Sequence, residues 1–151
     1  MPIRESLPEV DHRATSSASS VSSAMVTLSL PADKDYVVLA RSAVAHLGAR
    51  VGLSMEEISD LRLAVSEACV LFLAGDFLQV VGETLDCTFA ESEGALHVTV
   101  AASIEAPGTP AVDSFGWNLL AALVDELHWV DGDVQGRARV HLTKAPAFRG
   151  R

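Results

Sequence analysis

An α/β two-layer sandwich, with three helices on one face of a mostly antiparallel sheet, is the fold class that this sequence predicts. Segments with an apolar residue at every second position alternate with segments whose apolar residues recur at steps of three and four. The chain has 151 residues, 49% of them apolar and 21% charged, which is the size and composition of one globular domain. We expect one folded domain over residues 24–145, between a flexible serine-rich tail over 1–23 and a short tail over 146–151.

The first strand is predicted where the serine-rich stretch ends. Residues 15–24 read TSSASSVSSA, and side chains so small and polar bury too little surface to offset the entropy of ordering the chain. Val26, Leu28 and Leu30 then alternate with polar residues, which is the period of a half-buried strand. Pro31 is expected to end that strand.

Two helices are expected next. From residue 33 to about residue 50, apolar side chains that include Tyr36 recur with helical spacing and form one stripe. The tetrapeptide SMEE at 54–57 is a capping box, in which the serine and the last glutamate satisfy each other's backbone amides and start the second helix. On that helix Glu67 shares a face with two leucines, four residues before and four residues after it.

The rest of the chain predicts a hairpin, a loop, a third helix and a closing pair of strands. Alternating apolar residues over 85–89 and 96–100 flank a turn at 91–94. Residues 104–113 hold two prolines and a glycine, which favour a loop of about ten residues. The third helix, capped by Asp113 or Ser114, is expected to present an apolar face of Phe115, Leu119, Leu120, Leu123 and Leu127. Trp129 and the alternation over 138–142 complete the sheet.

Charge and cysteine content exclude several functions. With 11 basic against 20 acidic residues the net charge is −9, which repels a phosphate backbone and disfavours direct nucleic-acid binding. Cys69 and Cys87 lack the spacing of a metal knuckle or a redox pair, so we expect buried, reduced side chains. No long continuous apolar run occurs, and we expect a cytoplasmic protein that does not contact the membrane.

Few residues point to chemistry. The phosphate-binding loop and the GxGxxG, HExxH and GxSxG motifs are absent from the sequence. No metal site is expected, because no ligand spacing links the histidines at 12, 46, 97, 128 and 141. Glu67 is the one titratable group in an apolar helical setting and is the candidate general base. The alternative is a glutamate at the helix rim that reaches solvent or an arginine such as Arg62.

The segment LRLAVSEAC at residues 61–69 carries a family resemblance. Together with the preceding SMEE cap, LSLPA at 28–32 and VHLTK at 140–144, it resembles the RsbW/SpoIIAB group of bacterial anti-sigma factors. The resemblance spans roughly residues 25–145. It implies the GHKL (Bergerat) fold of histidine-kinase-like ATPases, in a group of serine/threonine kinases, which agrees with the sandwich inferred from the pattern.

The resemblance also implies that the nucleotide site is degenerate. Glu67 matches the glutamate of the family's ExxxN box, but Leu71 stands where an asparagine helps to hold Mg²⁺, and an apolar side chain cannot ligate a hard cation. Residues 101–105 lack the adenine-binding aspartate of the family. The remnants of the ATP boxes are Gly108, Ser114, Gly116 and Gly136. Such losses are similar to those of the actinobacterial UsfX (anti-sigma F) branch, so we expect no cofactor.

A partner-binding residue follows from the same resemblance. Arg41 matches an arginine on the first helix that contacts both the sigma factor and its antagonist in the family. The expected function is that of a homodimeric anti-sigma factor, which sequesters a stress- or sporulation-type sigma factor from RNA polymerase until a STAS-domain anti-anti-sigma protein competes. Two alternatives stay open. One is an active kinase that phosphorylates its antagonist with ATP and Mg²⁺, and the other is an interaction module for an unrelated partner.

Overall fold

A computed structural model of the chain describes residues 24–74, 82–105, 110, 113–131 and 136–148. The predicted tail over 1–23, Gly108 and most of the predicted loop after residue 105 lie outside the described residues. The elements follow the order β1 (Met25–Pro31), a 3-10 turn η2 (Lys34–Tyr36), α1 (Val37–Arg50), α2 (Met55–Leu73), β2 (Thr84–Ser92), β3 (Ala95–Ser103), α3 (Phe115–Leu123), β4 (Glu126–Val130) and β5 (Arg137–Lys144).

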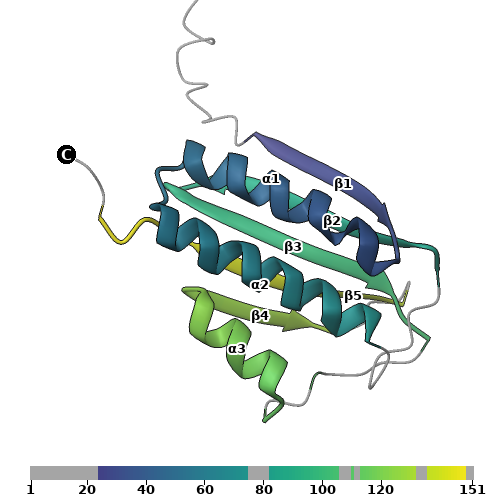
Figure 1. The fold of residues 1–151 in the computed structure, drawn as a ribbon. Coiled ribbons are helices and arrows are strands. Elements are labelled where there is room, and N and C mark those ends of the chain that lie inside the picture. The colour runs from purple at the N-terminus through teal and green to yellow at the C-terminus, as the bar shows by residue number, and fades with distance from the viewer. Residues whose placement is uncertain (1–23, 75–81, 106–109, 111–112, 132–135, 149–151) are drawn as a thin grey trace, which may run out of the picture.

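The strands form one sheet that the helices cover on one side. The strand order is β1-β2-β3-β5-β4, and each neighbouring pair is antiparallel. Figure 1 shows α1 and α2 side by side across the sheet, with α3 beyond α2 near β4. This arrangement confirms the predicted α/β sandwich with three helices on one face.

The hairpin of β2 and β3 follows from its turn. Ser92 pairs with Ala95, so the connection consists of Glu93 and Gly94 alone. Both have positive φ, 53° and 76°, as a type I′ turn requires. Because the turn fixes the register, the apolar side chains of both strands point to the same face of the sheet, toward the helices.

The predicted capping box starts α2. The Ser54 hydroxyl accepts from the Glu57 amide at 3.1 Å, and Glu57 Oε2 accepts from the Ser54 amide at 2.7 Å. The other oxygen, Glu57 Oε1, accepts from the Ala147 amide at 2.8 Å. A residue predicted to lie in the C-terminal tail is therefore bound to the start of α2. In the part of the chain that the structure describes, no helix is long and apolar enough to cross a membrane.

The start of α1 differs from the prediction. The carboxylate of Asp33 caps the 3-10 turn by accepting from the Asp35 amide at 2.9 Å, and the α-helix begins only at Val37. Tyr36, predicted on the apolar stripe, is 43% exposed. The stripe that packs on the sheet begins one residue later, because the tighter turn rotates the preceding side chains out of phase with the helix.

The predicted apolar face of α3 is wrong at both ends. Leu127 lies on β4, because the helix ends at Leu123 and the Asp125 amide donates to the Thr143 carbonyl of β5 at 2.9 Å. The ammonium group of Lys144 also donates to the Leu123 carbonyl at 2.9 Å and satisfies a free group at the helix end. Phe115, at the first turn, is 81% exposed. Sheet pairing therefore replaces the continuation of the helix.

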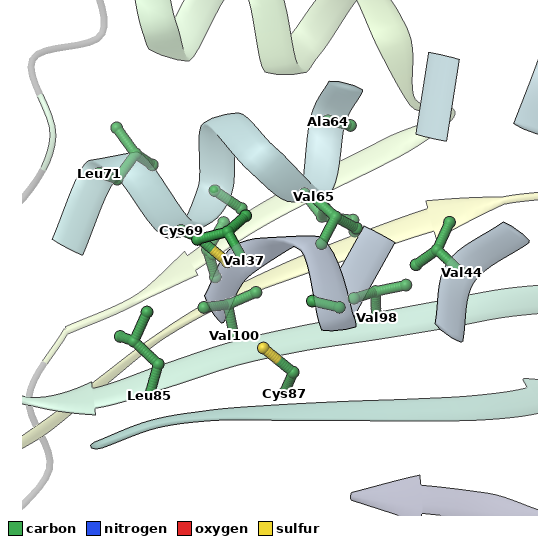
Figure 2. Packing of buried hydrophobic residues seen from close by; sticks show 14 of the residues in the cluster. Val37, Val44, Ala64, Val65, Cys69, Leu71, Leu85, Cys87, Val98 and Val100 are labelled. Atoms are coloured by element: carbon green, nitrogen blue, oxygen red, sulfur yellow. The ribbon is translucent and has the colours of Figure 1, made fainter. Parts of the chain in front are cut away.

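The core lies between the helices and the sheet. Figure 2 shows Val37 and Val44 from α1 and Val65 from α2 above Val98 and Val100 of β3. At the far side of the core, the rings of Phe72 on α2 and Trp129 on β4 stack with centroids 5.7 Å apart.

Candidate functional site

A cavity of about 300 Å³ lies between the second half of α2 and the start of α3. Its lining residues are Glu67, Val70, Leu71, Ala74, Ser114, Phe115 and Gly116. Four of them, Glu67, Leu71, Ser114 and Gly116, were predicted from two separate parts of the sequence. The structure brings these four into one site.

Local hydrogen bonding and packing position the α3 side of this cavity. Ser114 is the N-cap of α3, and its hydroxyl accepts from the Trp117 amide at 3.3 Å. A Cβ atom added to Gly116 would lie 3.7 Å from Glu67 Oε2 and 3.9 Å from Leu71 Cδ2. The first turn of α3 therefore packs directly against the face of α2 that carries Glu67 and Leu71.

The lining of the cavity is mostly apolar. Leu71 is only 6% exposed, so an alkyl group occupies the position where the resemblance implies a metal-ligating amide. Glu67 is half-buried and is the one charged residue among those lining residues. No ion pair joins Glu67 to Arg62 within the described ranges, so the predicted alternative of a pair with that arginine is not formed.

One other predicted remnant, Gly136, lies apart from this group. Gly136 stands before β5 with a φ of +72°, and its carbonyl accepts from the Ile104 amide at 2.8 Å. It does not line the cavity, and its left-handed backbone explains why glycine suits the position. Gly108 lies outside the described residues. Ala102, in the segment that lacks the aspartate, is fully buried in the core.

A second cavity of about 370 Å³ adjoins the first along α2. Val70 and Ala74 line both cavities, while Asp33 and Lys34 line only the second. Sequence reasoning did not single out Lys34 as a site residue. It lies far from α2 along the chain, and only the fold brings it to the end of that helix.

A third cavity, of about 270 Å³, lies between α1 and α2 and contains the predicted partner-binding residue Arg41. The other lining residues are Ser59, Arg62, Leu63 and Ser66 of α2. In the described part of the chain, the Nε atoms of Arg41 and Arg62 are buried and have no hydrogen-bond partner. Sequence reasoning missed this set, although residues 59, 62, 63 and 66 have the i, i+3, i+4, i+7 spacing of one helix face.

The two cysteines lie in the core, as predicted. Both are free and fully buried, and Figure 2 shows Cys69 on α2 facing Cys87 on β2. A hydrogen bond with the Cys87 thiol, together with burial, raises the pKa of the Cys69 thiol far above its ordinary value. Because the thiolate is the nucleophilic form, burial and the raised pKa disfavour reaction of the Cys69 thiol in the folded state.

Three predicted strand histidines lie on the sheet face opposite the core. His97 Nδ1 lies 3.2 Å from the Thr143 hydroxyl, and His141 Nδ1 lies 2.8 Å from the Thr99 hydroxyl. Burial, with the charges of Arg139 and His128, lowers the pKa of His141. Among the residues with described positions, no three His, Cys, Asp or Glu side chains are placed to hold a metal ion.

Comparisons with known proteins agree with this architecture. A family model for the histidine kinase-like ATPase domain matches residues 30–144. The serine-protein kinases RsbW of Bacillus thuringiensis (strain Al Hakam) and Bacillus anthracis are each 30% identical over 76 residues, which cover 50% of this chain and 47% of each relative. The match thus covers about half the length of these relatives.

A solved structure of the RsbU and RsbW domains of Rv1364c from Mycobacterium tuberculosis has the same fold. It superposes with a TM-score of 0.64 at 19% identity, over 85% of this chain and 34% of that chain.

The matched span and the sandwich together define a histidine kinase-like ATPase domain, and the chain belongs to that family. Within that family the chain is similar to the serine-protein kinases RsbW, the group that residues 61–69 resemble. The narrower resemblance to the UsfX branch stays a prediction.

Proposed function

We propose that this protein is an anti-sigma factor that sequesters a stress- or sporulation-type sigma factor from RNA polymerase. The observation that carries the proposal is Arg41, whose buried Nε atom has no partner among the described residues and which lines an open cavity between α1 and α2. An arginine fork in that state is ready to pair with a partner's carboxylate. The similarity to RsbW proteins supports the class of partner.

A STAS-domain anti-anti-sigma protein is the proposed competitor. Reciprocal linkage then requires that each partner weaken the binding of the other. We propose a homodimer that acts in the cytoplasm, where RNA polymerase works. Light scattering after size exclusion tests the dimer, because a mass of one chain at working concentration contradicts it.

The ATP site is proposed to be degenerate. Among the described residues that line the α2–α3 cavity, only the Glu67 carboxylate and the Ser114 hydroxyl offer side-chain oxygen ligands to Mg²⁺, and the hydroxyl already caps α3. The lining residues with described positions include no lysine or arginine to balance a polyphosphate. Sequestration needs only a complementary surface, so it can persist without nucleotide chemistry.

An active serine kinase is the second candidate. It is favoured by Glu67, which lines the cavity beside the start of α3, and by the serine-protein kinases among the relatives. Calorimetry with ATP and Mg²⁺ separates the two candidates. We expect millimolar or undetectable affinity, and no phosphate transfer to a STAS-domain protein. Tight nucleotide binding that Glu67→Gln abolishes would instead establish the kinase.

Co-expression with candidate sigma factors, followed by identification of the bound one, tests the main proposal. We expect Arg41→Glu to abolish capture while the far-ultraviolet circular dichroism spectrum stays unchanged, because the reversed charge repels the partner's carboxylate. Arg50→Glu makes the same charge change on the same helix, at an exposed surface ion pair with Glu91, and serves as the control. Capture that survives Arg41→Glu removes Arg41 from the interface, and capture of no sigma factor favours the unrelated interaction module.

A further inference from the structure

We propose that Arg62 of α2 is a second recognition residue, which joins Arg41 of α1 in a cleft that takes one carboxylate of the partner protein. The cleft is the cavity of about 270 Å³ lined by Arg41, Ser59, Arg62, Leu63 and Ser66. The proposal rests on the proposed function, since it specifies the side chain by which the partner is recognised.

Unsatisfied hydrogen-bond donors in the cleft point to a ligand. Both Nε atoms are buried and unpartnered within the described ranges, and a buried donor left unpaired costs free energy. Two other arginines of the described residues are paired, since Arg50 contacts Glu91 and Arg137 contacts Asp86. A carboxylate bound in the cleft would satisfy both donors once the guanidinium groups turn toward it.

The surroundings of the cleft favour a carboxylate on a protein. A carboxylate offers about four lone-pair sites, enough for one donor from each guanidinium group and a serine hydroxyl. One wall is Leu63, which is 44% exposed, and Val38, three residues before Arg41 on α1, is 52% exposed. A protein partner that places an acidic side chain in the cleft can also bury these apolar side chains with the residues around it. A free phosphate ion would leave them exposed to water.

The affinity for the captured sigma factor tests the proposal on the full-length protein. We expect Arg41→Ala and Arg62→Ala each to weaken binding by about 30-fold or more, as removal of one partner from a buried charged contact does. The double variant should lose less than the product of the two losses, because both side chains hold the same group. Arg50→Ala removes the same charge at an exposed pair and is expected to change the affinity less than about threefold.

Arg62→Lys adds a second check on geometry. A lysine keeps the charge but lacks the planar fork, so it should restore only part of the affinity. If Arg62→Ala changes the affinity less than about threefold while sigma capture continues, the cleft proposal is overturned and the proposed function stands.

A titration without the sigma factor separates the two proposals. Nitrogen-15 spectra of the arginine Nε–H groups are followed while the blocked peptide acetyl-Leu-Glu-Leu-amide, its Gln counterpart or inorganic phosphate is added. We expect saturable shifts of the Arg41 and Arg62 signals with the glutamate peptide only. Shifts with phosphate alone, or equal shifts with the glutamine peptide, overturn the carboxylate cleft. If no sigma factor is captured but the glutamate shifts appear, the cleft stands and the proposed function fails.

Discussion

Leu71 shows how a single side chain sets the chemistry of the α2–α3 cavity. It is buried beside Glu67 and lies within van der Waals reach of the first turn of α3, as the close approach of Gly116 shows. An alkyl group here contributes packing free energy and removes a potential oxygen ligand from the cavity. The Leu71 side chain thus contributes to packing and offers no oxygen ligand to a metal ion.

Replacement of Leu71 by asparagine tests this balance. We expect Leu71→Asn to lower the free energy of unfolding by about 2–4 kcal/mol, because it removes a buried alkyl group and buries an amide. Val70→Asn, at an adjacent position that is 42% exposed, should cost less than about 1 kcal/mol. Urea denaturation measures both. If Leu71→Asn also restores tight binding of ATP with Mg²⁺, the proposal of a degenerate site at several positions is wrong.

At the scale of elements, Glu57 links the start of α2 to the C-terminal segment. Its two carboxylate oxygens accept from the Ser54 and Ala147 amides. The hydrogen bond from Ala147, followed by that from Ser54, lowers the pKa of Glu57. The contact therefore holds the residues after β5 against the helix layer while the carboxylate is ionised.

The acid stability of the protein should depend on Glu57. Because its pKa in the folded state lies below the unfolded value, its contribution is present above about pH 4.5 and is lost as the pH falls through the folded-state pKa. We expect Glu57→Ala to cost about 1 kcal/mol at pH 7 and to flatten the acid limb of the stability curve. Glu56→Ala changes the same charge in the same helical turn and is the control. Equal acid limbs for the two variants would contradict the linkage.

At higher pH, the stability of the protein is expected to depend on His141, which lies on the sheet face opposite the core. Its lowered pKa means that the unfolded chain takes up the proton more readily, so stability falls as the pH drops below about 6.5. The midpoint temperature of thermal unfolding is measured between pH 7.5 and 5.5, which lies above the pH range in which Glu57 affects stability. It should depend less on pH in His141→Gln than in the parent. His46→Gln changes an exposed residue on α1 and is the control, which should show the same pH dependence as the parent. If His141→Gln also shows the pH dependence of the parent, His141 is not its cause.

At the scale of the whole molecule, Phe72 joins the two layers. It is 2% exposed, belongs to the core cluster and stacks on Trp129 of β4, which lies near the edge of the sheet. Its contact connects the central helix to the strand that is last in the spatial order of the sheet. The integrity of the sandwich, and with it the α2–α3 cavity, depends on this kind of contact between layers.

Removal of this ring should affect the molecule as a whole. We expect Phe72→Ala to lower the free energy of unfolding by about 3–5 kcal/mol, a large share of the roughly 5–15 kcal/mol typical of a domain. Leu39→Ala, at a position 49% exposed, should cost less than about 1 kcal/mol. Guanidinium unfolding followed by circular dichroism measures both. A cost for Phe72→Ala as small as that of Leu39→Ala would mean that the layers are held mainly by other contacts.

Local patterns in the sequence predicted most of the fold. The alternation of Leu28 and Leu30, the cap at 54–57 and the turn at 91–94 act between residues near in the chain, so they can be recognised without the fold. Leu127 could not be assigned in this way, because both a helix and a strand would bury it. The hydrogen bond from Asp125 to Thr143, 18 residues away in the chain, decides for the strand.

The candidate site divides in the same way. The chemical groups that are available follow from the residue types alone: a glutamate at 67, a leucine at 71, an arginine at 41 and an excess of acidic residues. The folded chain is needed to bring Ser114 and Gly116 to the cavity that Glu67 lines, and to place Arg62 beside Arg41 with a buried donor that has no partner among the described residues. The physical reason is that residue type and helix spacing are local properties, whereas burial and hydrogen-bond satisfaction depend on neighbours that only folding brings together.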